Sequence, residues 1–257
     1  CGTVRVAEMS RFYYDFHMHS CLSPCGDAEM TPANIAGMAS LAGLQLIALT
    51  DHNSARNCPA FFAAAEKYGI IPVAGMELTT AEDIHAVCLF ERLEDALCFN
   101  DEVDRMRVRI RNREDIFGEQ LLMDEEDHIL GREADLLPNA TRISLEELPA
   151  WMERYGGISY PAHIDRDSNG ILAVLGAFPP ELPFLCAEVR DPGRTEALCD
   201  RYPVLRDRRI LTGSDAHFLW EIRDAEATIE LNGLPAKEPP AEEIRRALFR
   251  MLRGEGK

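Results

Sequence analysis

Long hydrophobic runs are absent from this sequence. None of its 257 residues lies in an uninterrupted apolar stretch of about 18 or more, so no membrane-spanning helix is expected. Residues 1–11 contain no basic segment followed by an apolar one, which is the pattern of a signal peptide. We therefore expect a cytoplasmic protein that has no membrane partner.

Positive charge is also scarce. The chain has 27 Lys and Arg against 44 Asp and Glu, which gives a formal net charge of −17. Binding to a nucleic-acid backbone requires clustered basic side chains, so a long nucleic acid is not an expected partner. A small phosphorylated substrate remains compatible with this acidity, because bound divalent cations reverse the local sign of the field.

Cysteine occurs without a disulfide pattern. The eight cysteines are scattered along the chain, and several have apolar neighbours, where a thiol acts as a small hydrophobic group. We expect them to be reduced. Cys21 and Cys25 differ from the others because they lie just after two histidines.

Short apolar strands alternate with helical segments along most of the chain. Thr31-Pro32 and Gly43 are typical of the start and the end of a helix, and Ser144 to Glu147 has the spacing of a capping box. Further helices are expected at residues 59–68 and 144–155, and strands at residues 12–16, 44–49, 70–76, 84–90, 158–160, 185–189 and 209–211. This alternation indicates parallel βαβ units. About seven units predict one closed or nearly closed α/β barrel over residues 11–257.

Residues 100–139 do not fit this repeat. Val103, Met106 and Ile110 predict an amphipathic helix, along which the arginines between positions 105 and 113 would spread around all sides. Residues 121–131 resemble a hairpin around an acidic turn. The segment is either a solvated elaboration or a lid over the mouth of the barrel, since it follows a strand and such connections emerge at the carboxyl end.

Histidine is concentrated near the ends of the expected strands. In an extended backbone His17 and His19 point to the same face, which makes them a ready pair of metal ligands. Six of the seven histidines have such positions, often with carboxylates nearby: His17, His19, His52, His85, His163 and His217. His128 lies in the charged segment instead. Imidazoles mixed with carboxylates suit Zn, Mn or Fe better than Mg or Ca.

Together these motifs resemble the PHP family, named for polymerase and histidinol phosphatase. The resemblance extends from residue 11 to about residue 220 and rests on His17-Met18-His19-Ser20, Thr50-Asp51-His52-Asn53, Gly75-Met76-Glu77, His85, Pro161-Ala162-His163 and Gly213-Ser214-Asp215-Ala216-His217. It implies a distorted seven-stranded (β/α) barrel that carries three metal ions.

The resemblance also implies a ligand set. The first metal would be held by His17, His19, Glu77 and Asp215. Glu77 would bridge to a second metal held by His85 and His163. The third would be held by His52, His217 and a residue of the loop after His19.

The loop ligand of the third metal departs from the family pattern. The position that is commonly His or Asp in the family is Cys25 here. Either Cys25 binds as a thiolate, which suits Zn or Fe, or Asp27 takes its place, or the third site is weak. We therefore expect two to three divalent ions.

A hydroxide that bridges two metals about 3.5–4 Å apart is nucleophilic near neutral pH and attacks a phosphate in line. Glu77 and Asp215 would hold the metals for this step. Arg166 and Arg190 are candidates to grip the phosphate, although either could form an ordinary surface ion pair.

These features predict a metal-dependent phosphoesterase that acts on a small phosphomonoester or nucleotide. One alternative is a PHP scaffold that keeps its metals for structure only. The other is a hydrolase of the amidohydrolase type, which typically uses a carboxylated lysine as the bridge. No lysine occurs at an expected strand end.

Overall fold

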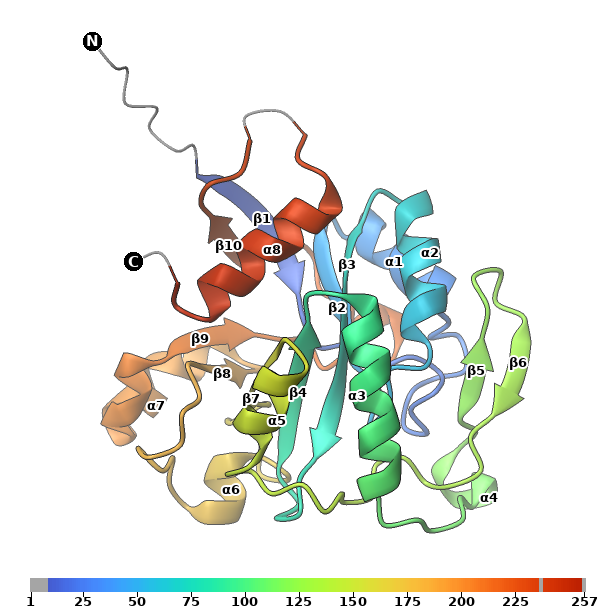
Figure 1. Ribbon diagram of the computed structural model, residues 1–257, viewed down its shortest axis with the longest axis horizontal. Helices are drawn as coiled ribbons and strands as arrows, with labels where there is room; N and C mark the ends of the chain where they lie inside the picture. The colour runs from blue at the N-terminus through green and yellow to red at the C-terminus, as the bar shows by residue number, and fades with distance from the viewer. Residues whose placement is uncertain (1–8, 236–237, 256–257) are drawn as a thin grey trace.

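A mixed six-stranded sheet forms the centre of the fold. The computed structural model describes residues 9–235 and 238–255. The strand order is β10-β1-β2-β3-β4-β7, and the sheet curls around the molecule (Figure 1). Its strands are β1 (Ser10–Asp15), β2 (Leu46–Leu49), β3 (Ile71–Thr79), β4 (His85–Phe90), β7 (Gly157–Pro161) and β10 (Thr228–Leu231).

A parallel pair of strands, β8 (Cys186–Val189) and β9 (Arg209–Thr212), completes the ring. The amide of Ile164, just after β7, donates to the carbonyl of Glu188 in β8 at 2.8 Å. The amide of His19, after β1, donates to the carbonyl of Ala216, after β9, at 2.9 Å. These bonds join both edges of the pair to the large sheet. The expected distorted seven-stranded barrel is therefore confirmed, and β10 is an additional strand beside β1.

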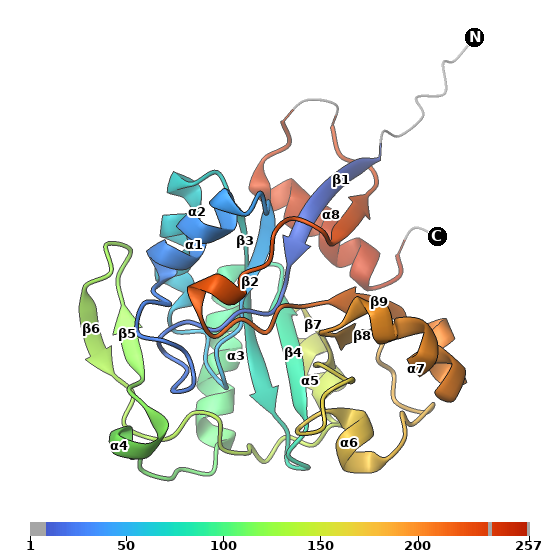
Figure 2. The same ribbon diagram turned by 180° about the vertical axis from the view of Figure 1, so that it is seen from behind.

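Helices cover the outside of the sheet and one end of the barrel (Figures 1 and 2). As expected, Thr31 caps a helix by accepting a hydrogen bond from the amide of Asn34. Ser144 and Glu147 exchange the two bonds of a capping box. The α-helices are α1 (Pro32–Leu41), α2 (Cys58–Lys67), α3 (Leu93–Met106), α4 (Glu114–Phe117), α5 (Leu148–Arg154), α6 (Ile171–Leu175), α7 (Thr195–Arg201) and α8 (Ala241–Leu252), and short 3-10 helices are η1 (Pro192–Arg194), η2 (Pro203–Asp207) and η3 (Leu219–Glu221).

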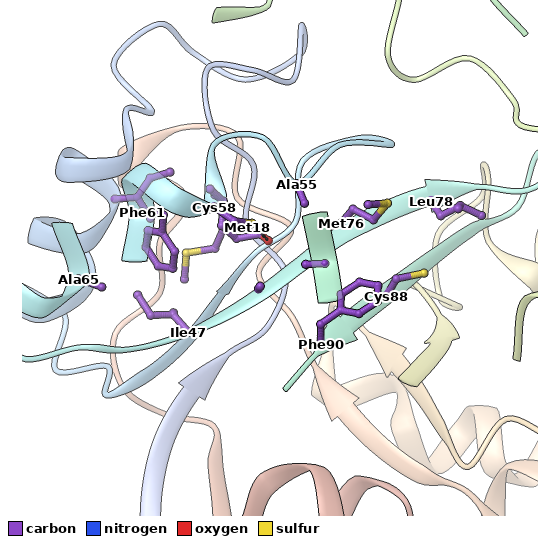
Figure 3. Close-up of a cluster of buried hydrophobic side chains, with 14 of the residues drawn as sticks. Met18, Ile47, Ala55, Cys58, Phe61, Ala65, Met76, Leu78, Cys88 and Phe90 are labelled. Carbon is purple, nitrogen blue, oxygen red and sulfur yellow. Dashed lines mark hydrogen bonds between the residues drawn. The ribbon is translucent and has the colours of Figure 1, made fainter. Parts of the chain in front are cut away.

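Both faces of the central strands are buried. On β2, Ile47 and Leu49 pack in the cluster that includes Phe61 of α2 (Figure 3), while Leu46 and Ala48 lie in a second cluster with residues of α8. A strand that is covered on both faces needs apolar residues at consecutive positions. This explains why the strand appeared in the sequence as an apolar run without alternation.

Strand β4 runs antiparallel to both of its neighbours, so the expectation of parallel units throughout is wrong there. Thr79 pairs with His85, and Ala86 pairs with Pro161. Only residues 80–84 connect β3 to β4, and a parallel crossover needs a dozen or more residues. His85 therefore begins its strand rather than ending it, yet it lies at the same end of the barrel as the carboxyl ends of β3 and β7.

The reversed direction of β4 also changes the path into residues 100–139. The chain leaves β4 at the end of the barrel far from His85, and α3 returns it to the histidine end (Figure 1). The helix ends at Met106, so Ile110 is not on it, and the arginines do not spread around a helix as predicted. Residues 107–111 are extended because they pair with the returning chain: Val108 donates to Ala140, and Arg111 forms a bridge with Asp135.

The hairpin expected around the acidic turn is present as β5 (Leu121–Met123) and β6 (Ile129–Arg132). It packs on the loop that follows β1, since the amide of Leu121 donates to the carbonyl of Cys21 at 2.8 Å. The buried amide of Asn57 accepts from the amide of Met123 at 3.0 Å and donates to the carbonyl of Leu121 at 3.1 Å. Residues 118–132 are thus attached to the barrel near the histidines.

We expect the substitution Asn57→Ala to loosen this hairpin. The substitution removes these two bonds and a third, which Asn57 donates to Ser20 at 3.0 Å. Three buried bonds at about 1 kcal/mol each predict a loss of roughly 2–3 kcal/mol in the free energy of unfolding. Denaturant unfolding measures the loss, and limited proteolysis should cut first within residues 118–132. Unchanged stability and an unchanged cleavage pattern would contradict this attachment.

No helix of the described chain is long and apolar enough to cross a bilayer. The seven cysteines within residues 9–235 are all unpaired. The prediction that no signal peptide is present concerns residues 1–11, of which residues 1–8 lie outside the described part. The last two residues of the expected domain, 256–257, also lie outside it.

Candidate metal centre

The histidine end of the barrel gathers side chains from six strands. Each of the acidic and histidine residues selected from the sequence lies there: His17 and His19 after β1, His52 after β2, Glu77 in β3, His85 at the start of β4, His163 after β7, and Asp215 and His217 after β9. All are buried except His217, whose side chain is 19% exposed. We call this set the histidine centre.

Glu77 lies in the middle of the histidine centre. Its Oε1 is 2.9 Å from Nδ1 of His85 and 2.9 Å from Nε2 of His163. Its Oε2 is 3.1 Å from Nδ1 of His52 and 3.3 Å from Nε2 of His19. A single buried carboxylate is thus surrounded by imidazole nitrogens on both of its oxygens, which is the environment of a bridging ligand.

Four side chains bring one ligand atom each within 4.8 Å of one another: His17, His19, Glu77 and Asp215. Asp215 Oδ1 is 3.6 Å from Nε2 of His17 and 3.3 Å from Nε2 of His19. The two Nε2 atoms are 3.2 Å apart, because Met18 between them points into the core and turns both rings to one side. This group has the composition that the family resemblance implied for the first metal.

Within the histidine centre two further groups meet the same 4.8 Å limit. His52, Glu77 and His85 form one, and His19, His52 and His217 form the other. A fourth group, on the exposed hairpin turn, consists of Asp124, Glu126 and His128. His163 belongs to none of these groups, although its Nε2 contacts Glu77. The Nδ1 of His217 lies 2.7 Å from the carbonyl oxygen of Asp215, so this nitrogen carries the proton and Nε2 presents a lone pair.

Two other histidines are oriented in the same way by groups behind them. Nδ1 of His17 is 2.7 Å from Oε1 of Glu188, which is 1% exposed. Nδ1 of His19 is 3.1 Å from the hydroxyl of Ser23, whose own proton goes to Asp51 at 2.7 Å. Both imidazoles therefore have a partner at Nδ1 and turn Nε2 inward. Carboxylates behind ligating histidines fix the ring and raise its basicity.

Glu188 and Asp51 were not recognised as site residues from the sequence. Asp51 accepts from both the amide and the hydroxyl of Ser20, at 2.7 and 2.6 Å, and so shapes the loop after β1. A signal existed for Glu188, since it is the one charged residue in the apolar strand Cys186–Val189. Buried carboxylates are rare without a partner, and this position could have been marked on that ground.

The residues present fit divalent metal ions. Asp215 Oδ1 and His52 Nδ1 are buried and have no hydrogen-bond partner in the described structure. Leaving such atoms unpaired costs about 1–3 kcal/mol each, whereas a cation would satisfy both. The Nε2 atoms of His17 and His19 face each other at 3.2 Å, so one cation placed between them would contact both. Imidazole nitrogens with carboxylate oxygens are the donors of Zn, Mn and Fe sites.

The titratable groups of the centre affect one another strongly. Burial opposes protonation of His17 and His19, but the neighbouring carboxylates outweigh it, raising the pKa of His17 well above its usual value and that of His19 to about 9, so a bound cation would replace protons there. Burial alone would raise the pKa of Glu77, but the nearby His85 and His17 outweigh it and hold the pKa well below its usual value. Burial likewise opposes ionisation of Asp215, yet His17 lowers its pKa. Burial keeps the pKa of His52 well below the usual value, so this ring stays neutral. Ionised carboxylates and neutral imidazoles are the forms that bind metals.

Unusual backbone geometry accompanies the ligand positions. His163 and Asp215 have φ values of 29° and 54°, a region that residues other than glycine rarely adopt. Such conformations persist where the surrounding structure enforces them, and they cluster at functional sites. Gly213 is needed nearby because a Cβ there would lie 2.5 Å from Oε2 of Glu188.

Both arginines selected from the sequence lie beside Asp215. Arg166 Nη1 donates to Asp215 Oδ2 at 2.6 Å, and Arg190 Nε lies 3.8 Å from the same oxygen. Arg190 Nε also donates to the carbonyl of Ser214 at 3.2 Å. Their side chains are 38% and 37% exposed, so both guanidinium groups are partly open to solvent beside Asp215.

Cys25 and Asp27 do not join the histidine groups. Neither belongs to the sets of ligand atoms within 4.8 Å among the described residues. Cys25 is exposed, and Asp27 Oδ1 accepts from the amide of Glu29 at 2.9 Å. The loop is nevertheless adjacent, since the amide of Asp27 donates to the carbonyl of His217 at 2.8 Å.

We expect Glu188→Gln to weaken metal binding without unfolding the barrel. The amide keeps the size of the side chain and one acceptor, but it removes the charge that supports His17. Losses of about 10- to 100-fold in metal affinity are typical of such changes. Competition with a chelating dye measures the affinity, and circular dichroism checks the fold. An affinity equal to that of the original protein would show that Glu188 has no such role.

Several solved structures resemble this chain. The lesion-specific endonuclease EndoQ of Pyrococcus furiosus superposes with a TM-score of 0.64 at 15% identity, covering 96% of this chain and 57% of the endonuclease. A protein of Bifidobacterium adolescentis that is assigned as a metal-dependent phosphoesterase superposes with a TM-score of 0.56 at 17% identity. The match covers 92% of this chain and 96% of that protein. An amidohydrolase of Chromobacterium violaceum superposes with a TM-score of 0.55 at 19% identity, and the match covers 94% of this chain and 96% of the amidohydrolase.

These likenesses establish the fold, and the chain spans little more than half the length of the endonuclease. No curated protein matches the sequence. A family model of the PHP domain matches residues 15–144, which is just over half of the chain. The sequence match, together with the distorted barrel and its histidine centre, shows that this protein belongs to the PHP family and has the fold of its metal-dependent hydrolases.

Proposed function

We propose that this protein is a metal-dependent phosphoester hydrolase that acts on a small phosphorylated substrate. The observation that supports this most is the pairing of a cation site with exposed arginines. Glu77 is shared by two groups of candidate ligands, and Arg166 and Arg190 lie partly open to solvent beside Asp215. A phosphate is the group that divalent metals and guanidinium groups both bind.

The proposed ligand assignment follows the family. His17, His19, Glu77 and Asp215 would hold one ion, and Glu77 would extend to a second with His85 and His163. His52 and His217 would hold a third, with Cys25 or Asp27 as a further ligand. His52 also lies close enough to Glu77 to serve the second site. Two to three ions of Zn, Mn or Fe are therefore proposed.

Metal ions bound there would supply a water-derived nucleophile near neutral pH and withdraw charge from a phosphoryl oxygen. The chain itself orients the substrate. Arg166 keeps one N–H on Asp215 and has further donors for a phosphate oxygen, while Arg190 is held by the carbonyl of Ser214. Both guanidinium groups would therefore grip the phosphate from one side.

A DNA phosphodiester is the second candidate substrate, because a structure of endonuclease Q with an abasic duplex resembles this chain with a TM-score of 0.63. The net charge of −17 opposes a long polyanion. The segment 118–132 also packs beside the histidine centre and would act as a lid. We therefore favour a small substrate.

Two other interpretations have less support. A structural scaffold would not need partly exposed arginines beside its metal groups. An amidohydrolase with a carboxylated lysine lacks a residue for that role within the described chain, where Lys67 pairs with Glu126 on the surface. Unpaired cysteines are typical of a reducing compartment, which supports a cytoplasmic location.

The proposed function predicts metal-dependent turnover. Protein purified without chelators should contain two to three equivalents of metal by elemental analysis. Removing the metal should abolish hydrolysis, and adding Mn, Zn or Fe should restore it. A panel of phosphomonoesters and an abasic duplex, assayed with the restored protein, identifies the substrate class. Less than one equivalent after reconstitution, or no hydrolysis of any phosphoester, would overturn the proposal.

A further inference from the structure

A cavity of about 280 Å³ opens beside the histidine centre. One wall is the loop of residues 21–28, the second is formed by Gly118, Glu119 and Leu121 from the segment between α3 and β7, and the third is Phe218. Its volume is near the lower end of the roughly 300–1,000 Å³ of small-molecule sites. We call it the side cavity.

The walls of the side cavity are attached to a candidate metal ligand, His217. Phe218 directly follows His217 in the chain, and the amide of Asp27 donates to the carbonyl of His217 at 2.8 Å. The amide of His217 in turn donates to the carboxylate of Glu221 at 2.8 Å, which fixes the segment that carries Phe218. A substrate whose phosphate is bound at the histidine centre would reach this cavity with its leaving group.

An aromatic pair borders the side cavity. The rings of Phe218 and Trp220 stack with centroids 4.4 Å apart and planes 22° from parallel. Trp220 is 73% exposed, although it is the largest apolar side chain on this segment. Phe218 is partly buried and lines the cavity, with Trp220 stacked against it, and aromatic faces of this kind bind planar rings by stacking.

The charges of the side cavity differ from those at the arginines. No Lys or Arg lines it, whereas Asp27 and Glu119 do, and Glu119 is paired with Arg132. An anionic group would be repelled here and attracted to Arg166 and Arg190 instead. The two regions therefore divide a ligand into a phosphate end and an uncharged end.

From this division we propose that the side cavity binds the aromatic base of a nucleotide, with the base stacked on Phe218 and Trp220 supporting that ring. The inference rests on the proposed phosphoester hydrolysis and names its substrate class. A nucleobase is favoured over an aliphatic group because the wall it meets is an aromatic face. It is favoured over a second phosphate because Glu119 and Asp27 line the cavity and no Lys or Arg does.

Binding of a nucleoside tests this directly and does not depend on hydrolysis. The chain has two tryptophans, so in a Trp151→Phe background Trp220 is the only one that emits. Adenosine added to this metal-loaded protein should change the Trp220 fluorescence, whereas ribose should not. In the same background, the substitution Phe218→Ala should raise the dissociation constant for adenosine roughly tenfold. The substitution Phe218→Tyr keeps an aromatic ring and should leave this constant unchanged. No fluorescence change with adenosine, or an equal change with ribose, overturns the proposal.

Kinetics separates the subsite from the proposed function. We expect Phe218→Ala to lower the ratio of kcat/KM for adenosine monophosphate to that for glycerol phosphate by about tenfold. Tyr13→Ala, which removes an exposed aromatic ring on β1 that does not line the cavity, should leave the ratio unchanged. An unchanged ratio in Phe218→Ala contradicts the base subsite. So does a loss of kcat/KM in Phe218→Ala that is confined to a hexose phosphate. If no phosphoester is hydrolysed while adenosine still binds, the proposed hydrolysis fails and the ring site stands.

Discussion

Replacing Glu77 with Gln is expected to remove nearly all hydrolytic activity and most of the bound metal. Both oxygens of Glu77 face imidazole nitrogens, at 2.9 Å from His85 and 3.1 Å from His52. Glutamine has the same shape, but its amide nitrogen cannot bind a metal and its oxygen carries no charge. Two groups of candidate ligands would lose their shared member, so a loss in kcat of about 10³-fold or more is expected.

Elemental analysis and single-substrate kinetics measure this effect, and circular dichroism tests whether the barrel remains folded. Glu66→Gln is a matched control, because Glu66 is an exposed glutamate on α2. It should leave metal content and turnover unchanged. Full metal content in Glu77→Gln, or turnover above about a tenth of the original, would rule out a bridging role.

The second large effect is expected for Asp215→Asn. Asp215 serves two functions at once, because Oδ1 faces His17 and His19 while Oδ2 accepts from Arg166 at 2.6 Å. The amide would weaken the first metal group and leave Arg166 without its anchor. Hydrolysis of a chromogenic phosphoester should fall by on the order of 10²- to 10³-fold. His85→Ala should be similarly inactive, since it removes a candidate ligand without disturbing the core.

Asp207→Asn provides the control for this variant, since Asp207 is exposed at the end of η2 and precedes β9, whereas Asp215 follows that strand at its other end. The two asparagine variants should have the same midpoint of thermal unfolding within a few degrees. Loss of activity together with loss of the folded state would point to a structural role instead. Turnover near the original value would contradict the assignment of Asp215.

Local sequence patterns determined much of the barrel. Each expected strand has a counterpart, because a strand buried on both faces must be apolar at consecutive positions, as in Leu46–Leu49. The capping residue Thr31 was predictable because its hydroxyl bonds an amide only three residues away. The convergence of His17 and His19 followed from the two-residue repeat of an extended chain. Their role as metal ligands stays a prediction.

Only the tertiary structure decided which segments meet and in which direction they run. The short turn before His85 reverses β4, and α3 ends at Met106 because the residues after it pair with the returning chain. Glu188 supports His17 from a position 171 residues away. Such contacts depend on chain direction and packing between distant segments, for which a local pattern carries no information. The sequence alone therefore determined the strands and the candidate ligands, and the packing of the barrel decided how they are oriented and which carboxylates support them.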